Sequence, residues 1–252
     1  MANRETKYSE ALAGFQAQRD SRSGLDFVMW IMAIIVSLSL IFLCACASNS
    51  GDKGASSNAS QATTEQSQDS TTQKSGLYTP AADDIYAKGM HHATIEVANY
   101  GTIELELNAD AAPITVSNFC HLANDGFYNG LTFHRIIKDF MVQGGDPNGN
   151  GTGGSSQHIK GEFSSNGVVN PIQHKRGVIS MARSTDADSA SSQFFIMQKD
   201  TASLDGQYAA FGQVTNGMDV VDALCAKVKV QDNNGTVASA DQPVITKITI
   251  TD

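Results

Sequence analysis

Short stretches of alternating apolar and polar residues dominate the chain from residue 92 onward. Alternation runs over residues 95–97 and 103–107, on either side of the turn Asn99-Tyr100-Gly101. A period of two is typical of a strand with one buried face, so this stretch predicts a β-hairpin. Other short apolar stretches, separated by Gly-, Asn- and Asp-rich turns, predict six more strands, at residues 132–137, 141–143, 177–181, 194–197, 210–214 and 244–251.

Helical spacing of apolar residues occurs in two places. Pro113 suits the first position of a helix whose inward residues include Phe119 and Cys120, and Gly126 fits just beyond its end. A second, shorter helix is predicted between Gly217 and Ala226. Many short strands with only two helices predict an all-β domain, built as a closed antiparallel barrel or a sandwich.

The first 46 residues have a different character. The run Val28–Ala45 contains no charge, and at about 1.5 Å rise per residue it is near the shortest helix that crosses a bilayer. It ends in Leu43-Cys44-Ala45-Cys46, which resembles a bacterial lipobox with Cys46 as the lipid-bearing residue. We therefore expect residues 1–46 to be an export signal or membrane anchor. Lipidation at Cys46 is the favoured form, and an uncleaved transmembrane helix is the alternative.

Both alternatives place the C-terminal part of the chain outside the cytoplasm, attached to the bacterial cell membrane. Residues 47–88 are rich in Ser, Thr and Gln and poor in large apolar side chains, which predicts a disordered linker. Residues 89–252 then form the folded domain.

Charge and motifs exclude several classes of function. From residue 92 onward the chain has 10 Lys and Arg against 17 Asp and Glu, which argues against nucleic acid as a partner. The loop Gly149–Gly154 fits the pattern G-x-G-x-x-G, but no strand directly precedes it and no helix opens at its end, so we reject a dinucleotide site. No hydrolase or zinc-protease motif is present, and we interpret His134 as a packed or hydrogen-bonded strand residue.

The most informative stretch is Phe133–Asp146, FHRIIKDFMVQGGD, which combines a cation, an amide and large apolar groups. It resembles the central motif of the cyclophilins, the peptidyl-prolyl cis-trans isomerases. Further matches are Gly177–Ala182 with Ser192–Ile196, and Leu204–Tyr208 with the following Phe211-Gly212. The resemblance covers roughly residues 92–252. It implies a closed eight-stranded antiparallel barrel capped by two helices, here preceded by an apolar export or anchor helix and a disordered linker.

The resemblance also implies an active site. We expect Arg135, Gln143 and Phe140 to be the catalytic residues, and Phe140, Met141 and Phe195 to form a pocket for the proline ring. Gln143 in the neighbouring strand is placed to orient the guanidinium. The expected substrate-binding residues are Met141, Thr152, Ala182, Arg183, Gln193, Phe195, Leu204 and Tyr208, with Ala182 and Arg183 acting through the backbone and Tyr208 replacing a histidine of the family pocket.

The reaction expected is rotation about an X-Pro peptide bond in proline-containing unfolded or folding polypeptides outside the cytoplasm. It needs no nucleophile, metal or cofactor. The alternative is a membrane-tethered chaperone or adaptor that binds proline segments without turnover. We expect a monomer. In the cyclophilin fold the two helices lie at opposite ends of the barrel, so Cys120 and Cys225 are expected to be buried free thiols rather than a disulfide.

Overall fold

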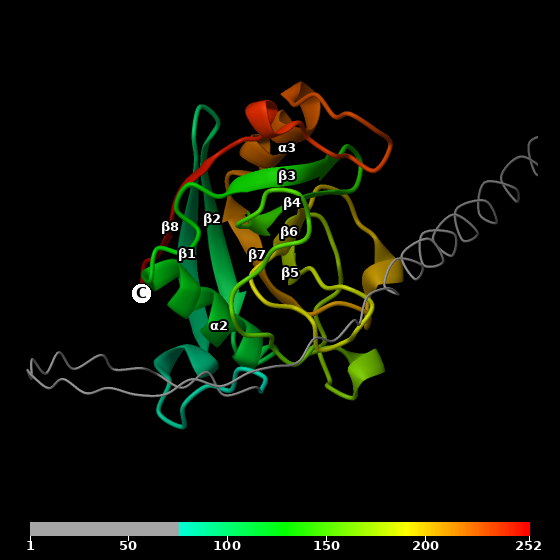
Figure 1. The fold of residues 1–252 in the computed structure, drawn as a ribbon. Helices are drawn as coiled ribbons and strands as arrows, with labels where there is room; N and C mark the ends of the chain where they lie inside the picture. Colours follow the sequence, from blue (N-terminus) through cyan, green and yellow to red (C-terminus); the bar gives the residue numbers. More distant parts are fainter. Residues whose placement is uncertain (1–75) are drawn as a thin grey trace, which may run out of the picture. The chain divides into compact units, whose positions relative to one another are not determined.

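The computed structural model describes residues 76–252, and one antiparallel sheet organises this part of the chain (Figure 1). Its strand order is β3-β4-β6-β5-β7-β2-β1-β8. The strands are β1 (Met90–Val97), β2 (Gly101–Asn108), β3 (Thr132–Ile137), β4 (Met141–Asp146), β5 (Val178–Met181), β6 (Phe194–Met197), β7 (Ala210–Asn216) and β8 (Ile245–Ile250). The predicted hairpin is β1 with β2, and Asn99 in its turn has a left-handed φ of 66°.

The two edge strands of the sheet, β3 and β8, approach each other near the start of β3. Gly130 donates its N–H to the Ile245 carbonyl at 2.8 Å, and Ile245 donates to the Leu131 carbonyl at 2.7 Å. A single antiparallel bridge then pairs Thr132 with Val244. Within residues 76–252 the expectation of eight antiparallel strands with two α-helices is confirmed, and the sheet curves into a half-barrel.

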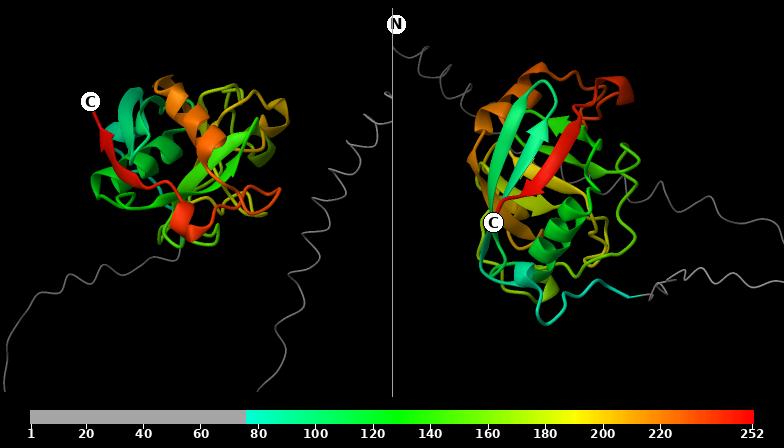
Figure 2. Two further views of the ribbon diagram at one scale, coloured as in Figure 1. Left: turned by 90° about the horizontal axis from the view of Figure 1, so that it is seen from above. Right: turned by 90° about the vertical axis from the view of Figure 1, so that its left-hand side faces the viewer.

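The helices α2 (Pro113–Asn124) and α3 (Met218–Lys227) lie at opposite ends of the sheet (Figures 1 and 2). Helix α2 begins without a cap from its own sequence. Glu162, from a distant loop, instead accepts the N–H groups of Ile114 at 3.0 Å and Thr115 at 2.8 Å. A carboxylate at this end satisfies otherwise unpaired donors and complements the helix dipole.

An aromatic cluster centred on Phe119 fills the core. The Phe119 ring lies 5.3 Å from those of Tyr128 and Phe211 and 5.7 Å from that of Phe194. Cys120 beside it is buried, as is the free Cys225, so the prediction of two buried thiols is confirmed. Burial raises the pKa of the Cys120 thiol to about 12, so this group stays protonated and unreactive at neutral pH.

The folded domain begins earlier than the predicted boundary at residue 89. Tyr78 donates its N–H to the His158 carbonyl at 2.8 Å. Asp84 is 9 % exposed and accepts hydrogen bonds from Ser117 at 2.5 Å and His121 at 3.0 Å, both on α2. These few anchoring side chains order a segment whose average composition predicts disorder.

The described residues also form four short 3₁₀ helices that were not predicted from the sequence: η1 (Ile85–Ala87), η2 (Ser164–Asn166), η3 (Ala202–Leu204) and η4 (Ser239–Asp241). Within residues 76–252, no helix combines the length and the apolar character that a membrane crossing requires. The predicted export segment, Cys46 and the linker up to residue 75 lie outside the described residues.

Candidate active site

Arg135 and Gln143 lie opposite each other on the antiparallel strands β3 and β4. Directly paired residues on neighbouring strands point to the same face, and here the guanidinium Nη1 donates to Gln143 Oε1 at 3.2 Å. The prediction that Gln143 orients Arg135 therefore matches the geometry.

A pocket of about 250 Å³, lined mostly by apolar and aromatic side chains, adjoins this pair. Phe195 and Met141 are almost fully buried in its wall, at 5 % and 2 % exposure. Register explains their position, because Phe195 on β6 is the direct partner of Gln143 on β4. The structure brings together every residue predicted for the proline pocket; the lining consists of Arg135, Phe140, Met141, Gln143, Ala182, Arg183, Phe195, Leu204 and Tyr208.

Phe140 reaches the pocket from a tight turn. Asp139 occupies the left-handed region with φ 60°, and the Phe140 N–H donates to the Ile137 carbonyl at 3.1 Å. The Phe140 carbonyl in turn accepts the N–H of Gln198 at 2.8 Å. This turn places the ring at the mouth of the pocket while Met141, the next residue, begins β4.

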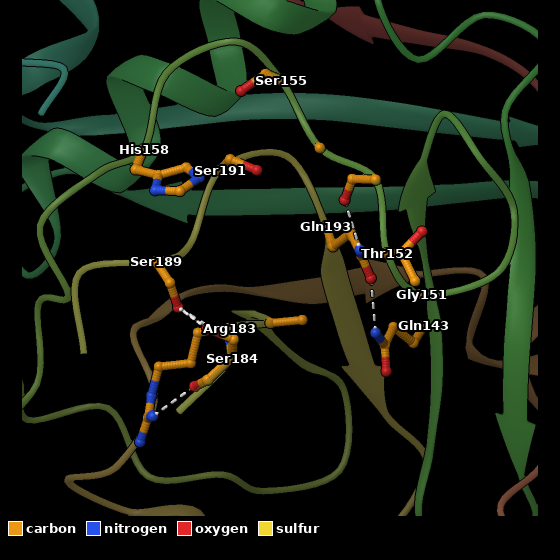
Figure 3. A pocket seen from close by; sticks show the side chains of 13 residues that line it. Gln143, Gly151, Thr152, Ser155, His158, Arg183, Ser184, Ser189, Ser191 and Gln193 are labelled. Carbon is orange, nitrogen blue, oxygen red and sulfur yellow. Dashed lines mark hydrogen bonds between the residues drawn. The ribbon is translucent and has the colours of Figure 1, made fainter. Parts of the chain in front are cut away.

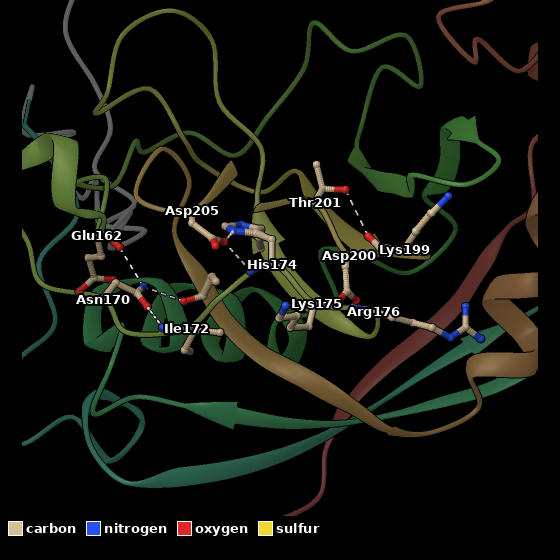
Figure 4. A network of polar contacts seen from close by, with 12 residues as sticks. Glu162, Asn170, Ile172, His174, Lys175, Arg176, Lys199, Asp200, Thr201 and Asp205 are labelled. Atoms are coloured by element: carbon tan, nitrogen blue, oxygen red, sulfur yellow. Dashed lines mark hydrogen bonds and ion pairs between the residues drawn. The ribbon is translucent and has the colours of Figure 1, made fainter. Parts of the chain in front are cut away.

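The Phe195 ring is packed from two sides. Tyr208 meets it edge-on, with ring centroids 5.7 Å apart, and His174 stacks on it at 6.0 Å with 16° between the planes. His174 faces Asp205 (Figure 4), and its ring nitrogens lie 3.0 Å from Asp205 Oδ1 and from Ser180 Oγ. Asp205, His174 and Ser180 are connected in the same way as the three residues of a hydrolase triad, but Ser180 is completely buried. These three side chains therefore support Phe195 and do not act on a substrate.

Asn234 is a second partner of Arg135 that was not predicted from the sequence. The guanidinium Nε donates to the Asn234 carbonyl at 2.8 Å, and Nη2 donates to Asn234 Oδ1 at 3.1 Å. The only sequence signal was the turn dipeptide Asn234-Gly235. Gly235 has φ 78°, and a Cβ there would lie 2.4 Å from the Ile136 carbonyl oxygen, so glycine is required for the loop to approach β3.

The charge of Arg135 is held by amide groups and not by a carboxylate. Within residues 76–252 no acidic side chain forms a salt bridge with it. Burial lowers the pKa of its guanidinium, with Tyr208 and Asp232 acting in the opposite direction. Arginine nevertheless remains protonated in proteins. The pocket is thus bordered by a fixed cation that has no salt-bridge partner in the described part of the chain.

A second, polar cleft of about 330 Å³ adjoins the first, and Gln143, Ala182 and Arg183 line both (Figure 3). Gln143 donates to Gln193 Oε1 at 2.8 Å, and Gln193 donates to the Gly153 carbonyl at 2.7 Å. The hydrogen bonds therefore run in one direction through both cavities, from Arg135 to Gln143, from Gln143 to Gln193 and from Gln193 to the Gly153 carbonyl. The expected Gln193 and Thr152 line this cleft, while the Ala182 N–H is already engaged by the Gln193 carbonyl at 2.9 Å.

The glycine-rich loop is wrapped around the buried carboxylate of Asp146. Asp146 accepts the N–H groups of Asn148 at 2.8 Å, Asn150 at 3.0 Å and Gly151 at 2.5 Å. A Cβ at Gly153 would lie 2.1 Å from Asp146 Oδ1. The glycines are thus needed for close packing, which agrees with the rejection of a dinucleotide site.

His134 is packed, as expected, but not hydrogen-bonded. It is 4 % exposed, and neither ring nitrogen has a partner among the described residues. Burial lowers its pKa, with Asp146 opposing and Arg135 reinforcing the effect. Within residues 76–252 no group of three or more His, Cys, Asp and Glu side chains is arranged to hold a metal.

Known proteins share much of this sequence. A sequence model of the family described as "Cyclophilin type peptidyl-prolyl cis-trans isomerase/CLD" matches residues 92–251. The peptidyl-prolyl cis-trans isomerase of Helicobacter pylori (strain ATCC 700392 / 26695) is 48 % identical over 135 residues, which cover 53 % of this chain and 79 % of that protein. Peptidyl-prolyl cis-trans isomerase B of Bacillus subtilis (strain 168) is 49 % identical over 117 residues, covering 46 % of this chain and 78 % of that protein.

Solved structures agree with the sequence comparison. A crystal structure of a Cryptosporidium parvum cyclophilin-type isomerase aligns with a TM-score of 0.58 at 29 % identity, covering 65 % of this chain and 99 % of that one. A second crystal structure of that protein, in the presence of the dipeptide Ala-Pro, gives a TM-score of 0.57 at 30 % identity and covers 64 % of this chain and 99 % of that one. The chain belongs to the cyclophilin family of peptidyl-prolyl cis-trans isomerases.

Proposed function

We propose that Arg135 is the catalytic group of this isomerase and that the enzyme acts on exported polypeptides while attached to the membrane. The observation that carries the catalytic proposal is the guanidinium on the border of the apolar pocket. Gln143 and Asn234 both accept hydrogen bonds from it, and within residues 76–252 no carboxylate forms a salt bridge with it.

The mechanism follows from the chemistry of the X-Pro amide. Resonance gives its C–N bond double-bond character and a barrier of about 18–20 kcal/mol. A twisted amide loses this resonance, and a lone pair localises on the prolyl nitrogen. Arg135 stabilises that lone pair through a charge-assisted hydrogen bond made only in the twisted state. Since about 1.36 kcal/mol corresponds to tenfold in rate, one such bond contributes roughly a hundredfold.

The aromatic pocket contributes in a different way. Phe140, Met141 and Phe195 are part of the lining of a pocket of about 250 Å³, which is large enough for a proline ring. An apolar environment favours the less polar twisted amide over the resonance form. Leu204 and Tyr208 also contact the proline ring. The ring stays fixed while the substrate residue before proline rotates.

The polar cleft takes the residues that precede proline in the substrate. Thr152 and Gln193 line it, and Gln193 keeps a second amide hydrogen for the peptide because Gly153 uses only one. The hydrogen bonds at Gly130, Leu131 and Ile245 close the barrel in this proposal, which keeps β3 and its Arg135 rigid relative to β8.

The sequence supports an extracytoplasmic location. An uncharged apolar run precedes Cys46, and a polar stretch separates it from the folded domain. We propose that the enzyme is a monomer attached by lipid at Cys46 and serves proline-containing chains that fold outside the cytoplasm. Intact mass of the membrane-extracted protein tests this: cleavage before Cys46 with added acyl chains supports lipidation, whereas the full-length mass points to a transmembrane anchor.

A protease-coupled assay with a short X-Pro peptide tests the catalytic proposal. The full-length protein should accelerate cis-to-trans exchange, and Arg135→Ala should reduce kcat/KM about a hundredfold. Arg176→Ala is the matched control, because Arg176 pairs with Asp222 outside both cavities. Equal acceleration by the Arg135→Ala variant and the wild type would refute the catalytic role of Arg135, whereas no acceleration by the wild type would favour a chaperone or adaptor that binds proline segments without turnover.

A further inference from the structure

The side chain of Arg183 lies between two aromatic rings. Its guanidinium carbon is 5.0 Å from the ring centroid of Phe163 and 4.8 Å from that of Tyr208. Phe163 is 2 % exposed and belongs to the core, whereas Tyr208 lines the proline pocket. The guanidinium therefore fills the gap between a fixed ring and a ring of the substrate site.

Every nitrogen of this guanidinium donates to a backbone carbonyl. Nε and Nη2 both donate to Gln207, at 3.0 and 2.9 Å. Nη1 donates to Ser184 at 3.0 Å and to Thr185 at 3.4 Å. The planar guanidinium of arginine can donate several directed hydrogen bonds and stack on aromatic rings at the same time. The ammonium group of lysine has neither this planar set of donors nor a flat face for stacking.

The side chain of Arg183 does not point toward the residues proposed to hold the peptide before proline, although Arg183 borders both cavities. In Figure 3 it extends away from Thr152 and Gln193, which line the polar cleft. Within residues 76–252 Arg183 has no salt-bridge partner, and its charge is balanced by the carbonyl dipoles and the two ring faces.

What Arg183 holds in place is the outer wall of the proline pocket. Gln207 and Tyr208 follow η3, which supplies Leu204, after the two residues Asp205 and Gly206. Tyr208 meets Phe195 edge-on at 5.7 Å and so fixes one side of the space for the ring. Tyr208 also lies close enough to Arg135 to influence its pKa. A displaced Tyr208 therefore widens the pocket without removing any group from the Arg135 network.

We propose that Arg183 is a positioning residue that sets the width of the proline pocket by clamping Gln207 and Tyr208 against Phe163. It acts on the affinity for the proline ring and not on the rotation barrier. This inference rests on the proposed function, since it takes the apolar pocket as the site of the ring.

The test compares kcat and KM of full-length wild type, Arg183→Ala and Arg183→Lys with a short X-Pro peptide. Both variants should raise KM about tenfold and leave kcat within about twofold, because only ring binding is weakened. Lysine keeps the charge but not the clamp, so it should not restore KM. Arg176→Ala is the control and should keep both constants.

The same series gives a structural signature. The aromatic proton resonances of Tyr208 should shift in both Arg183 variants, whereas those of Tyr128 in the core should not. An unchanged KM in Arg183→Lys would overturn the proposal, as would a fall in kcat at constant KM. If Arg183→Ala does not fold, the lysine variant decides by the same criteria.

Arg135→Ala separates this inference from the function on which it rests. Full activity of that variant would refute the catalytic role of Arg135 and leave the KM result for Arg183 intact. Loss of activity in Arg135→Ala with an unchanged KM in Arg183→Lys would refute only the clamp.

Discussion

Arg135 and Gln143 are direct partners in the β3–β4 register, and Nη1 of the arginine donates to Oε1 of the glutamine at 3.2 Å. The glutamine uses its other amide atom to donate to Gln193 at 2.8 Å. The orientation of the Gln143 amide is therefore fixed at both ends, and the fixed amide in turn restricts the guanidinium.

Replacing Gln143 with alanine should lower kcat about tenfold with little change in KM, because a guanidinium that loses its position loses transition-state stabilisation but not the pocket. Steady-state isomerisation kinetics of the full-length protein measure this. Gln213→Ala, at an exposed position of β7, is the control. A kcat within twofold of the wild-type value would show that Gln143 does not orient Arg135.

Asn234→Ala should lower kcat about threefold to tenfold. The effect is smaller than at Gln143 because only the Nη2 contact to the side chain is lost, and the Nε contact to the backbone carbonyl remains. The neighbouring Asn233→Ala serves as the matched control in the same kinetic assay. Equal kcat values for the two variants would argue against an orienting role of the Asn234 side chain.

Asp146→Asn should destabilise the fold by about 2 kcal/mol at pH 7, since a buried charged acceptor of three N–H groups is lost. Burial tends to raise the pKa of Asp146, but the three backbone donors outweigh it and hold this pKa below the ordinary 3.8. The stabilisation is therefore complete above pH 3.8 and is lost as the pH falls below that value.

Urea unfolding of wild type and Asp146→Asn at pH 7 and near pH 3 measures this difference. The gap between the two proteins in free energy of unfolding should narrow at the acidic pH. A gap of the same size at both pH values would mean that the carboxylate charge does not hold the loop.

His134→Phe should raise the free energy of unfolding by about 1 kcal/mol at pH 7, because an aromatic ring of similar size replaces buried nitrogens without partners. Burial lowers the pKa of His134 below the ordinary 6.5. The unfolded chain then binds a proton that the folded chain does not, so wild type loses stability as the pH falls below 6.5. The advantage of the variant should grow between pH 7 and pH 5, and a constant or negative difference would contradict the prediction.

Local patterns predicted most of the elements that carry the site. The strands at 132–137 and 194–197 have the predicted bounds, and the helices begin and end within two residues of expectation. These predictions were correct because the apolar residues of each element recur with the period of a strand or a helix. The pocket residues followed from resemblance, and the register of β3, β4 and β6 explains why Arg135, Gln143 and Phe195 meet.

Contacts between distant segments were not predictable in this way. Asn234 reaches Arg135 across 99 positions of the chain, and Asp84 reaches Ser117 across 33. Neither asparagine nor aspartate has a periodic pattern that reveals its partner. The resemblance implied only a backbone role for Arg183, and the stacking of its side chain depends on a ring at Phe163 that no local motif connects with it.

The rate of cis-trans interconversion of a proline peptide bound to the enzyme tests the central claim most directly. NMR exchange at saturating full-length protein gives this rate separately from affinity. Relative to wild type, Arg135→Ala should slow the bound interconversion about a hundredfold, with the dissociation constant changed by no more than about threefold. Arg135→Lys, which keeps the charge but not the fork, should fall in between. Bound interconversion at the wild-type rate in Arg135→Ala would contradict the account.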